Sequence, residues 1–247
     1  MKFFKVTATS ALLVSALSFG GASAFAEETK TLDSNAIVKF KANENVVTPV
    51  DPENPDPNKP VVPVDPTTPD GKPNPGTAGP LSIDFASSLD FGENVISTKD
   101  EQYFAAAQKL EGGEEKPNYV QVTDNRGTEA GWTLSVKQNG QFKDSQNREL
   151  TGAKITFNNG AVKTVSKSAE PSTVVSSFDL TADGTGAVQN VVGAKAGEGA
   201  GTYVYHFGDA VKKAESITLD VPGATTKYAD EYKTTLTWTL SDTPANN

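Results

Sequence analysis

The stretches Gly131-Trp132-Thr133-Leu134-Ser135-Val136 and Leu236-Thr237-Trp238-Thr239-Leu240-Ser241 decide the fold of this chain. They contain its two tryptophans, each within a Trp-x-Leu triplet. Apolar and polar residues alternate in both stretches, which is typical of a β-strand with one apolar face. The sequence therefore predicts two strands here. Because they carry the same apolar triplet, we expect them to lie close together in one closed unit.

Short runs rich in β-forming residues continue along the chain from Leu81, separated by turn residues such as Asn158-Asn159-Gly160 and Pro222-Gly223. Many short strands between such turns predict an all-β fold, a β-sandwich-like single domain over residues 81–247. Residues 100–110 have a helix-forming composition, and the sequence leaves a short helix and a strand both open there. The expected strand runs are 119–122, 132–136, 154–157, 174–180, 202–207, 216–221 and 234–240.

Residues 1–26 read as a signal peptide: Lys2 and Lys5 precede an uncharged apolar run that ends near small residues. We expect cleavage after Ala26, just before Glu27-Glu28. The alternative is a membrane anchor, which is disfavoured because the apolar run falls short of the ~20 residues that span a bilayer. Residues 27–48 form a short polar segment, with at most a short strand at 36–41.

Residues 49–80 contain eleven prolines in units such as Val64-Asp65-Pro66. Proline fixes φ and biases the preceding residue toward an extended backbone. The composition therefore predicts a disordered Pro/Asp-rich linker with polyproline II character, a semi-rigid spacer that precedes the domain.

The charge of the chain limits its partners. The net charge is −9, and loss of Lys2 and Lys5 with the signal peptide brings it to −11. Nucleic acid and anionic membranes attract basic surfaces, so we expect neither as the main partner. The chain has no cysteine, which excludes disulfides and thiolate metal sites. An exported chain without cysteine is more typical of bacteria, and its stability must come from an apolar core.

The residues around both tryptophans resemble a known family. Val122-Thr123-Asp124-Asn125-Arg126-Gly127 leads to the proximal triplet, while Tyr232 and Pro244 flank the distal one. Together with Pro80-Leu81-Ser82-Ile83-Asp84-Phe85, these motifs are similar to the WxL domain of surface proteins from lactobacilli, enterococci and listeriae. The likeness covers nearly the whole mature chain.

This resemblance implies a secreted cell-surface protein held non-covalently on the Gram-positive cell wall through a domain that binds peptidoglycan. It also implies partners: membrane-anchored WxL-interacting proteins and other WxL proteins, with host extracellular matrix as a further candidate. The alternative is a domain that mainly binds a protein partner, so that wall retention is indirect. The sequence shows no Leu-Pro-x-Thr-Gly sorting motif, and we therefore expect retention by non-covalent contact.

The residues expected to bind peptidoglycan or a partner are Trp132, Leu134, Trp238 and Leu240. Two interpretations of them stay open. They pack in the core, which is the favoured interpretation because tryptophan is strongly buried on average, or they form a partly open strip on which sugar rings stack. The two interpretations can coexist, with the motif holding the sandwich together while polar loops nearby contact glycan.

No catalytic, cofactor-binding or metal-binding residue is expected, and the sequence predicts that the protein is not an enzyme. His206, the single histidine, lacks the companions of a zinc site or of a nucleophile. A wall-degrading glycosidase would need paired carboxylates. Asp84, Asp90, Asp124 and Asp179 are candidates for such a pair only because they lie within or beside the expected strands.

Overall fold

The computed structural model describes residues 29–180 and 187–244, and the chain divides into two units, Met1–Lys39 and Phe40–Asn247. The signal peptide predicted at 1–26 lies outside the described residues. In the first unit, residues 29–39 are exposed and belong to no strand, so the short strand considered for 36–41 does not form.

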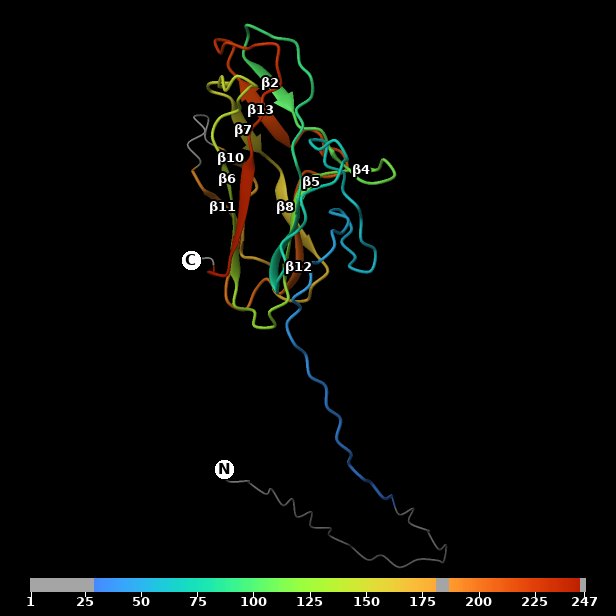
Figure 1. The fold of residues 1–247 in the computed structure, drawn as a ribbon. Helices are drawn as coiled ribbons and strands as arrows, with labels where there is room; N and C mark the ends of the chain where they lie inside the picture. The colour runs from blue at the N-terminus through green and yellow to red at the C-terminus, as the bar shows by residue number, and fades with distance from the viewer. Residues whose placement is uncertain (1–28, 181–186, 245–247) are drawn as a thin grey trace, which may run out of the picture. The chain divides into compact units, whose positions relative to one another are not determined.

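The second unit is built from antiparallel strands, which confirms the all-β prediction (Figure 1). Three four-stranded sheets have the orders β1-β5-β12-β8, β10-β7-β13-β2 and β14-β6-β11-β9, and β3 pairs with β4. No helix long and apolar enough to cross a bilayer occurs in residues 29–180 or 187–244. The strands are β1 (Leu81–Ala86), β2 (Glu101–Phe104), β3 (Gln108–Lys109), β4 (Glu115–Lys116), β5 (Asn118–Asp124), β6 (Trp132–Gln138), β7 (Lys154–Phe157), β8 (Gly160–Thr164), β9 (Thr173–Val174), β10 (Phe178–Asp179), β11 (Gln189–Ala194), β12 (Gly201–Phe207), β13 (Ile217–Val221) and β14 (Leu236–Ser241).

The main core lies between the sheets and draws side chains from all three four-stranded sheets. Aromatic rings form its centre, where the Phe157 ring centroid lies 4.7 Å from that of Phe178 and 4.8 Å from that of Phe207. Figure 1 shows the layer with β6, β11 and β14 facing the layer with β5, β8 and β12, while β2, β7 and β13 lie toward one end. This arrangement is the β-sandwich that the alternating runs predicted.

The segment 100–110, which the sequence left between helix and strand, forms β2 and β3. Four residues of β2 pair with β13, from Phe104 opposite Thr218 to Glu101 opposite Val221. Tertiary pairing thus overrides the helical propensity of the alanine-rich stretch.

The strand β5 is buried at all seven positions, so both of its faces are covered. Val120 and Val122 enter the main core. On the opposite face Tyr119 joins a second, smaller core with Val50, Phe85 and Val204. Because Val50 comes from the proline-rich region, that region covers the outer face of this sheet.

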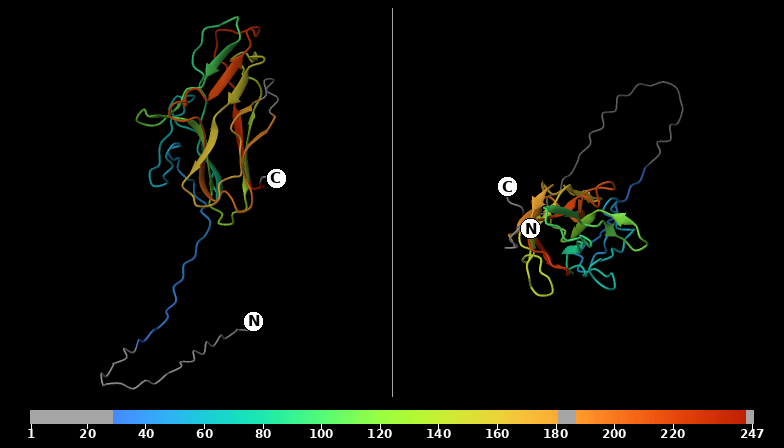
Figure 2. Two further views of the ribbon diagram at one scale, coloured as in Figure 1. Left: turned by 180° about the vertical axis from the view of Figure 1, so that it is seen from behind. Right: turned by 90° about the horizontal axis from the view of Figure 1, so that it is seen from above.

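The prediction of a disordered linker at 49–80 is therefore wrong for the part that we call the proline-rich cover, residues 49–65. The Val50 amide donates to Gln121 Oε1 at 2.8 Å, and the Val64 amide donates to the Lys109 carbonyl at 2.8 Å. A backbone that proline already holds extended loses little entropy on docking. Amides of the proline-rich cover donate hydrogen bonds to the rest of the domain. Figure 1 shows the cover, coloured blue to cyan, beside β5, and Figure 2 shows the same segment from two further directions.

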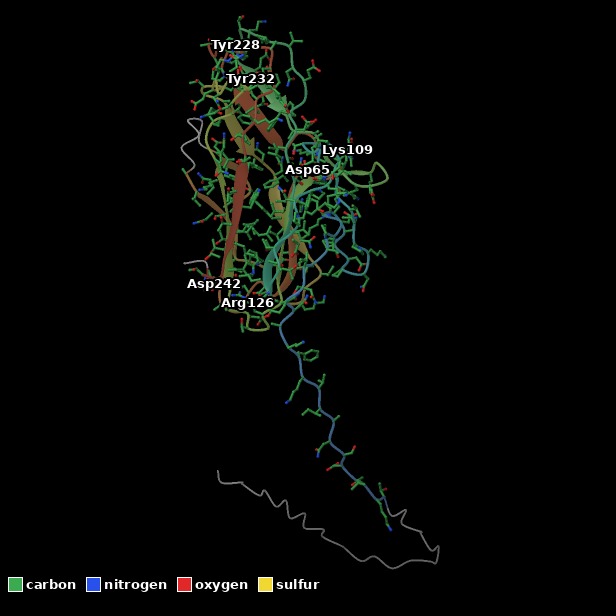
Figure 3. All side chains as sticks on the ribbon, in the orientation of Figure 1. Asp65, Lys109, Arg126, Tyr228, Tyr232 and Asp242 are labelled. Carbon is green, nitrogen blue, oxygen red and sulfur yellow. The ribbon has the colours of Figure 1, made fainter. Side chains whose placement is uncertain are left out.

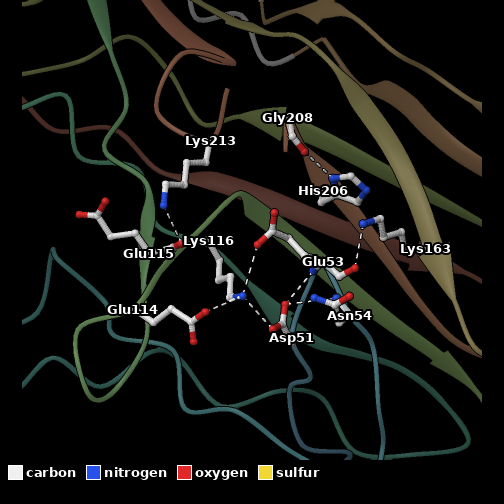
Figure 4. A network of polar contacts seen from close by, with 10 residues as sticks. All are labelled: Asp51, Glu53, Asn54, Glu114, Glu115, Lys116, Lys163, His206, Gly208 and Lys213. Carbon is white, nitrogen blue, oxygen red and sulfur yellow. Dashed lines mark hydrogen bonds and ion pairs between the residues drawn. The ribbon is translucent and has the colours of Figure 1, made fainter. Parts of the chain in front are cut away.

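A buried ion cluster fastens this cover (Figure 4). Lys116 Nζ lies 2.9 Å from an Asp51 oxygen, 3.3 Å from Glu53 and 2.7 Å from Glu114. Burial lowers the pKa of the Lys116 ammonium, but hydrogen bonds to the three carboxylates raise it well above its usual value. Two of those carboxylates, Asp51 and Glu53, belong to the cover, so undocking of the cover would break two of the three ion pairs of Lys116.

Candidate functional site

The two Trp-x-Leu strands are hydrogen-bonded neighbours, which confirms the prediction that they lie close together. In the antiparallel pair of β6 and β14, Trp238 is opposite Val136 and Leu240 is opposite Leu134. The strand β6 is central in its sheet, between β14 and β11, whereas β14 is an edge strand. This difference in position decides how much of each motif is accessible.

The proximal motif is enclosed. Trp132 is 1% exposed and Leu134 is fully buried, so neither is available to a ligand in this structure. The indole Nε1 of Trp132 donates to the Gly199 carbonyl at 2.9 Å, and its ring meets that of Tyr203 edge-on at 6.0 Å. For these two residues the structure favours the core interpretation over the sugar-stacking one.

The distal motif is only partly enclosed. Trp238 and Leu240 are half-buried and pack against the main core, while Thr237 and Thr239 are exposed between them. The Trp238 ring stands perpendicular to the Phe157 ring, with centroids 6.3 Å apart. Trp238 therefore anchors an edge strand and keeps some accessible surface.

The paired strands lead at one end into two loops, residues 139–151 after β6 and 222–235 before β14, which we call the tip loops. Lys143 and Lys233 exchange backbone hydrogen bonds of 2.9 and 2.8 Å between them. Thr225 Oγ1 donates to the Thr151 carbonyl at 2.6 Å. The Trp-x-Leu pair thus holds two loops, distant in sequence, against each other.

A hollow of about 510 Å³ lies in these loops, lined by Arg148, Glu149, Thr151, Ala224, Thr225, Thr226 and Tyr228. We call it the tip hollow. The Arg148 guanidinium carbon lies 3.4 Å from the centroid of the Tyr228 ring, a cation–π contact. Tyr228 remains 43% exposed. Figure 3 shows Tyr228 and Tyr232 at one end of the domain, with Arg126 and Asp242 at the other.

The charge and position of Arg148 are fixed by its neighbours. Asp144 Oδ2 accepts a hydrogen bond of 2.6 Å from Arg148 Nε. Burial lowers the pKa of the Arg148 guanidinium, but the hydrogen bond and charge of Asp144 raise it overall. The Tyr228 amide donates to the Tyr232 hydroxyl at 3.0 Å, which holds the ring-bearing turn. The hollow therefore combines an aromatic surface, a fixed cation and several hydroxyl groups.

A second concave surface of about 1020 Å³ lies between the proline-rich cover and β8. We call it the edge groove. Its lining residues are Asp51, Glu53, Asn54, Pro55, Asp56, Pro57, Asn58, Lys59, Pro60, Val61, Val162, Lys163, Thr164, Val165 and Glu170. Lys163 Nζ crosses between its walls and donates to the Glu53 carbonyl at 2.8 Å (Figure 4).

His206 is buried on the outer face of β12 beneath the cover. Its Nδ1 lies 2.7 Å from the Gly208 carbonyl, so Nδ1 carries the proton and donates. Burial lowers the pKa of this imidazole. A neutral, enclosed histidine of this kind fits a structural role.

The four aspartates considered for hydrolysis each hold local structure. Asp84 accepts from Ser82, Gln121 and Thr123, and burial raises its pKa. Asp124 binds Arg126 at 2.7 Å, Asp179 binds Lys154 at 3.0 Å, and Asp90 accepts from the Gly92 amide. Within 29–180 and 187–244, no three His, Cys, Asp or Glu side chains gather as a metal site.

The sequence reasoning missed Arg148 and Tyr228, because loop residues follow no periodic pattern. Both lie in the loops that adjoin the Trp-x-Leu strands, Arg148 after β6 and Tyr228 before β14, but no local signal in the sequence marks them. The fold and these two concave surfaces define an all-β binding module.

The chain belongs to the family of WxL domain surface cell wall-binding proteins, whose family model matches residues 27–244. No curated protein and no solved structure shows a significant match to it. Family membership places the chain at the cell surface, with binding to the cell wall as its function. The matched range includes the proline-rich cover.

Proposed function

We propose that this protein binds peptidoglycan directly and non-covalently, and that the tip hollow contacts the glycan. The observation that carries the proposal is the half-exposed Tyr228 ring, fixed by Arg148 in a hollow with three threonines. A tyrosine ring offers a flat apolar surface to the C–H face of a sugar at little entropic cost. Hydroxyl and carboxylate groups around it can hydrogen-bond to sugar hydroxyl and acetamido groups.

The Trp-x-Leu strands support this function from beneath. They position both tip loops, and their apolar side chains pack against the main core, so the motif acts on glycan through the loops that it holds. Membership of a cell wall-binding family supports the same assignment. We further propose that the protein binds peptidoglycan without hydrolysing it. Labelled peptidoglycan incubated with the protein should therefore release no soluble fragments.

The test is a pull-down of purified residues 27–247 with protein-free Gram-positive cell walls. Wild-type protein should sediment with the walls, and Tyr228→Ala should bind about tenfold more weakly, or ~1.4 kcal/mol. Phe104→Ala is the matched control, because Phe104 is an aromatic residue of similar exposure, 48%, outside the hollow. Equal loss in both variants, with folding intact by circular dichroism, would remove the tip hollow as the contact.

A second candidate is binding to a protein partner, with wall attachment indirect. The edge groove favours it, because a sheet edge beside a groove can accept an extended peptide. Failure of the wild-type protein to sediment with protein-free walls, together with sedimentation when wall-associated proteins are present, would favour this candidate.

A further inference from the structure

Residues 36–41, Ala-Ile-Val-Lys-Phe-Lys, carry large apolar side chains that are exposed. Ile37 is 88% exposed and Phe40 is 91% exposed. In an extended backbone Val38 and Phe40 share one face, and Ile37, Lys39 and Lys41 share the other. The segment is rich in β-forming residues but forms no strand. Such a row of exposed apolar residues marks an interaction site.

The strand β8 offers the complementary feature, an edge without a strand partner. In the described chain β8 pairs with β12 on one side only. The Gly160 amide donates to the Ser176 carbonyl, away from β12. Because backbone groups alternate in direction along an antiparallel strand, those of Val162 and Thr164 point to the same side. They face the edge groove, whose lining includes both residues.

Charge and polarity match between segment and groove. Four carboxylates line the groove, those of Asp51, Glu53, Asp56 and Glu170. Three ammonium groups oppose them: Lys59 and Lys163 in the lining, and Lys116, which binds Asp51 and Glu53. The carboxylates therefore exceed the ammonium groups by one. The segment carries Lys39 and Lys41 on one face. Its other face is apolar, as are the Val162 and Val165 side chains and the proline rings of the groove. A basic strand with one apolar face therefore fits this acidic edge.

We propose that residues 36–41 of one copy add as a strand to β8 of a second copy, within the edge groove. Main-chain hydrogen bonds to Val162 and Thr164 give the affinity, and the lysines fix the partner through the carboxylates. The donor segment and acceptor groove are different surfaces, so the contact is head-to-tail. It leaves a free segment and a free groove at the two ends of every assembly, which therefore grows as a chain of copies.

Cysteine cross-linking tests the contact directly, because the chain has no cysteine of its own. Phe40→Cys protein mixed with Val165→Cys protein should give a disulfide-linked heterodimer under mild oxidation. Val211→Cys is the matched control, since Val211 is also exposed but lies outside the groove. Equal yields from both mixtures, or no cross-linking with Val165→Cys, would overturn the proposal. All three positions are exposed, so the variants should fold as wild type does.

Sedimentation velocity supplies the second measurement. Residues 27–247 should associate increasingly with concentration, and residues 42–247 should stay monomeric. A synthetic peptide of residues 31–43 should bind the shorter protein and suppress cross-linking. A concentration-independent monomer of the longer protein would overturn the proposal. The tip hollow and the edge groove share no residue. The Tyr228→Ala variant should therefore self-associate as the wild-type protein does. Loss of wall binding and loss of self-association can thus be recognised separately.

Discussion

The two copies of the Trp-x-Leu motif have the same sequence, Trp-Thr-Leu, but differ in how deeply they are buried. Trp132 lies on a central strand and is 1% exposed, whereas Trp238 lies on an edge strand and is half-buried. Both rings make edge-on contacts with core aromatics. What separates them is the number of neighbouring strands. A repeated motif can therefore contribute unequally to stability, because the sheet position sets how much surface each copy buries.

The largest expected effect is that of Trp132→Ala. Removal of a fully buried tryptophan leaves a cavity and an unpaired Gly199 carbonyl, so the free energy of unfolding should fall by about 3–5 kcal/mol. Urea unfolding followed by circular dichroism measures this loss. A fall below about 1 kcal/mol would contradict the core position of the ring.

Gly199→Ala should come next, with a loss of about 3 kcal/mol. Gly199 has φ +79, and a Cβ there would lie 2.6 Å from Trp132 Nε1. The cost combines a left-handed backbone with overpacking against the indole. The same unfolding experiment applies, with Gly197→Ala as control, because Gly197 has φ +89 but open space around a Cβ. If both variants lose equal stability, contact with Trp132 adds nothing.

Trp238→Ala should cost roughly 2 kcal/mol, about half of the loss at Trp132, because the ring is only half-buried. It should also loosen the tip loops, since β14 leads directly from one of them. The backbone amides of Lys143 and Lys233 are hydrogen-bonded to each other's carbonyls across the loops. Their hydrogen exchange with solvent should therefore become faster in the variant. Unchanged exchange there would separate the distal motif from the tip.

Thr239→Val should change stability by less than about 0.5 kcal/mol, since Thr239 is exposed on the edge strand beside Trp238. Thermal unfolding would measure it. A loss as large as that of Trp238→Ala would mean that the edge position, and not the indole, determines the stability contributed by β14.

The strand pairing at the centre of the fold was predictable, because alternation and a shared triplet are local signals. The run 174–180 was less so. It divides between β9 and β10, which belong to different sheets, since Val175 bonds to Val191 while Leu180 bonds to Ile155. The strands β8 and β11 escaped prediction, because glycine and polar residues weaken their patterns.

The proline-rich cover could not be predicted from composition, because its stabilising partners lie elsewhere in the chain. The Val50 amide donates to the Gln121 side chain, which lies seventy-one residues later in the chain. No local sequence pattern indicates that these two residues pair. The tip hollow was hidden for a related reason. Arg148 and Tyr228 come from two loops that meet only after β6 and β14 have paired.

The long-range contacts of the proline-rich cover also determine the order in which parts of the domain can fold during synthesis. Lys163 Nζ donates a hydrogen bond to the Glu53 carbonyl, 110 residues earlier in the chain. In the same way, β6 can pair with β14 only after β14 has been synthesised. Translation delivers the cover first, yet it can dock only after β5 and β8 have formed. Long-range contacts of this kind slow folding. The nascent domain should therefore remain open, with unpaired sheet edges, until its last described strand has emerged.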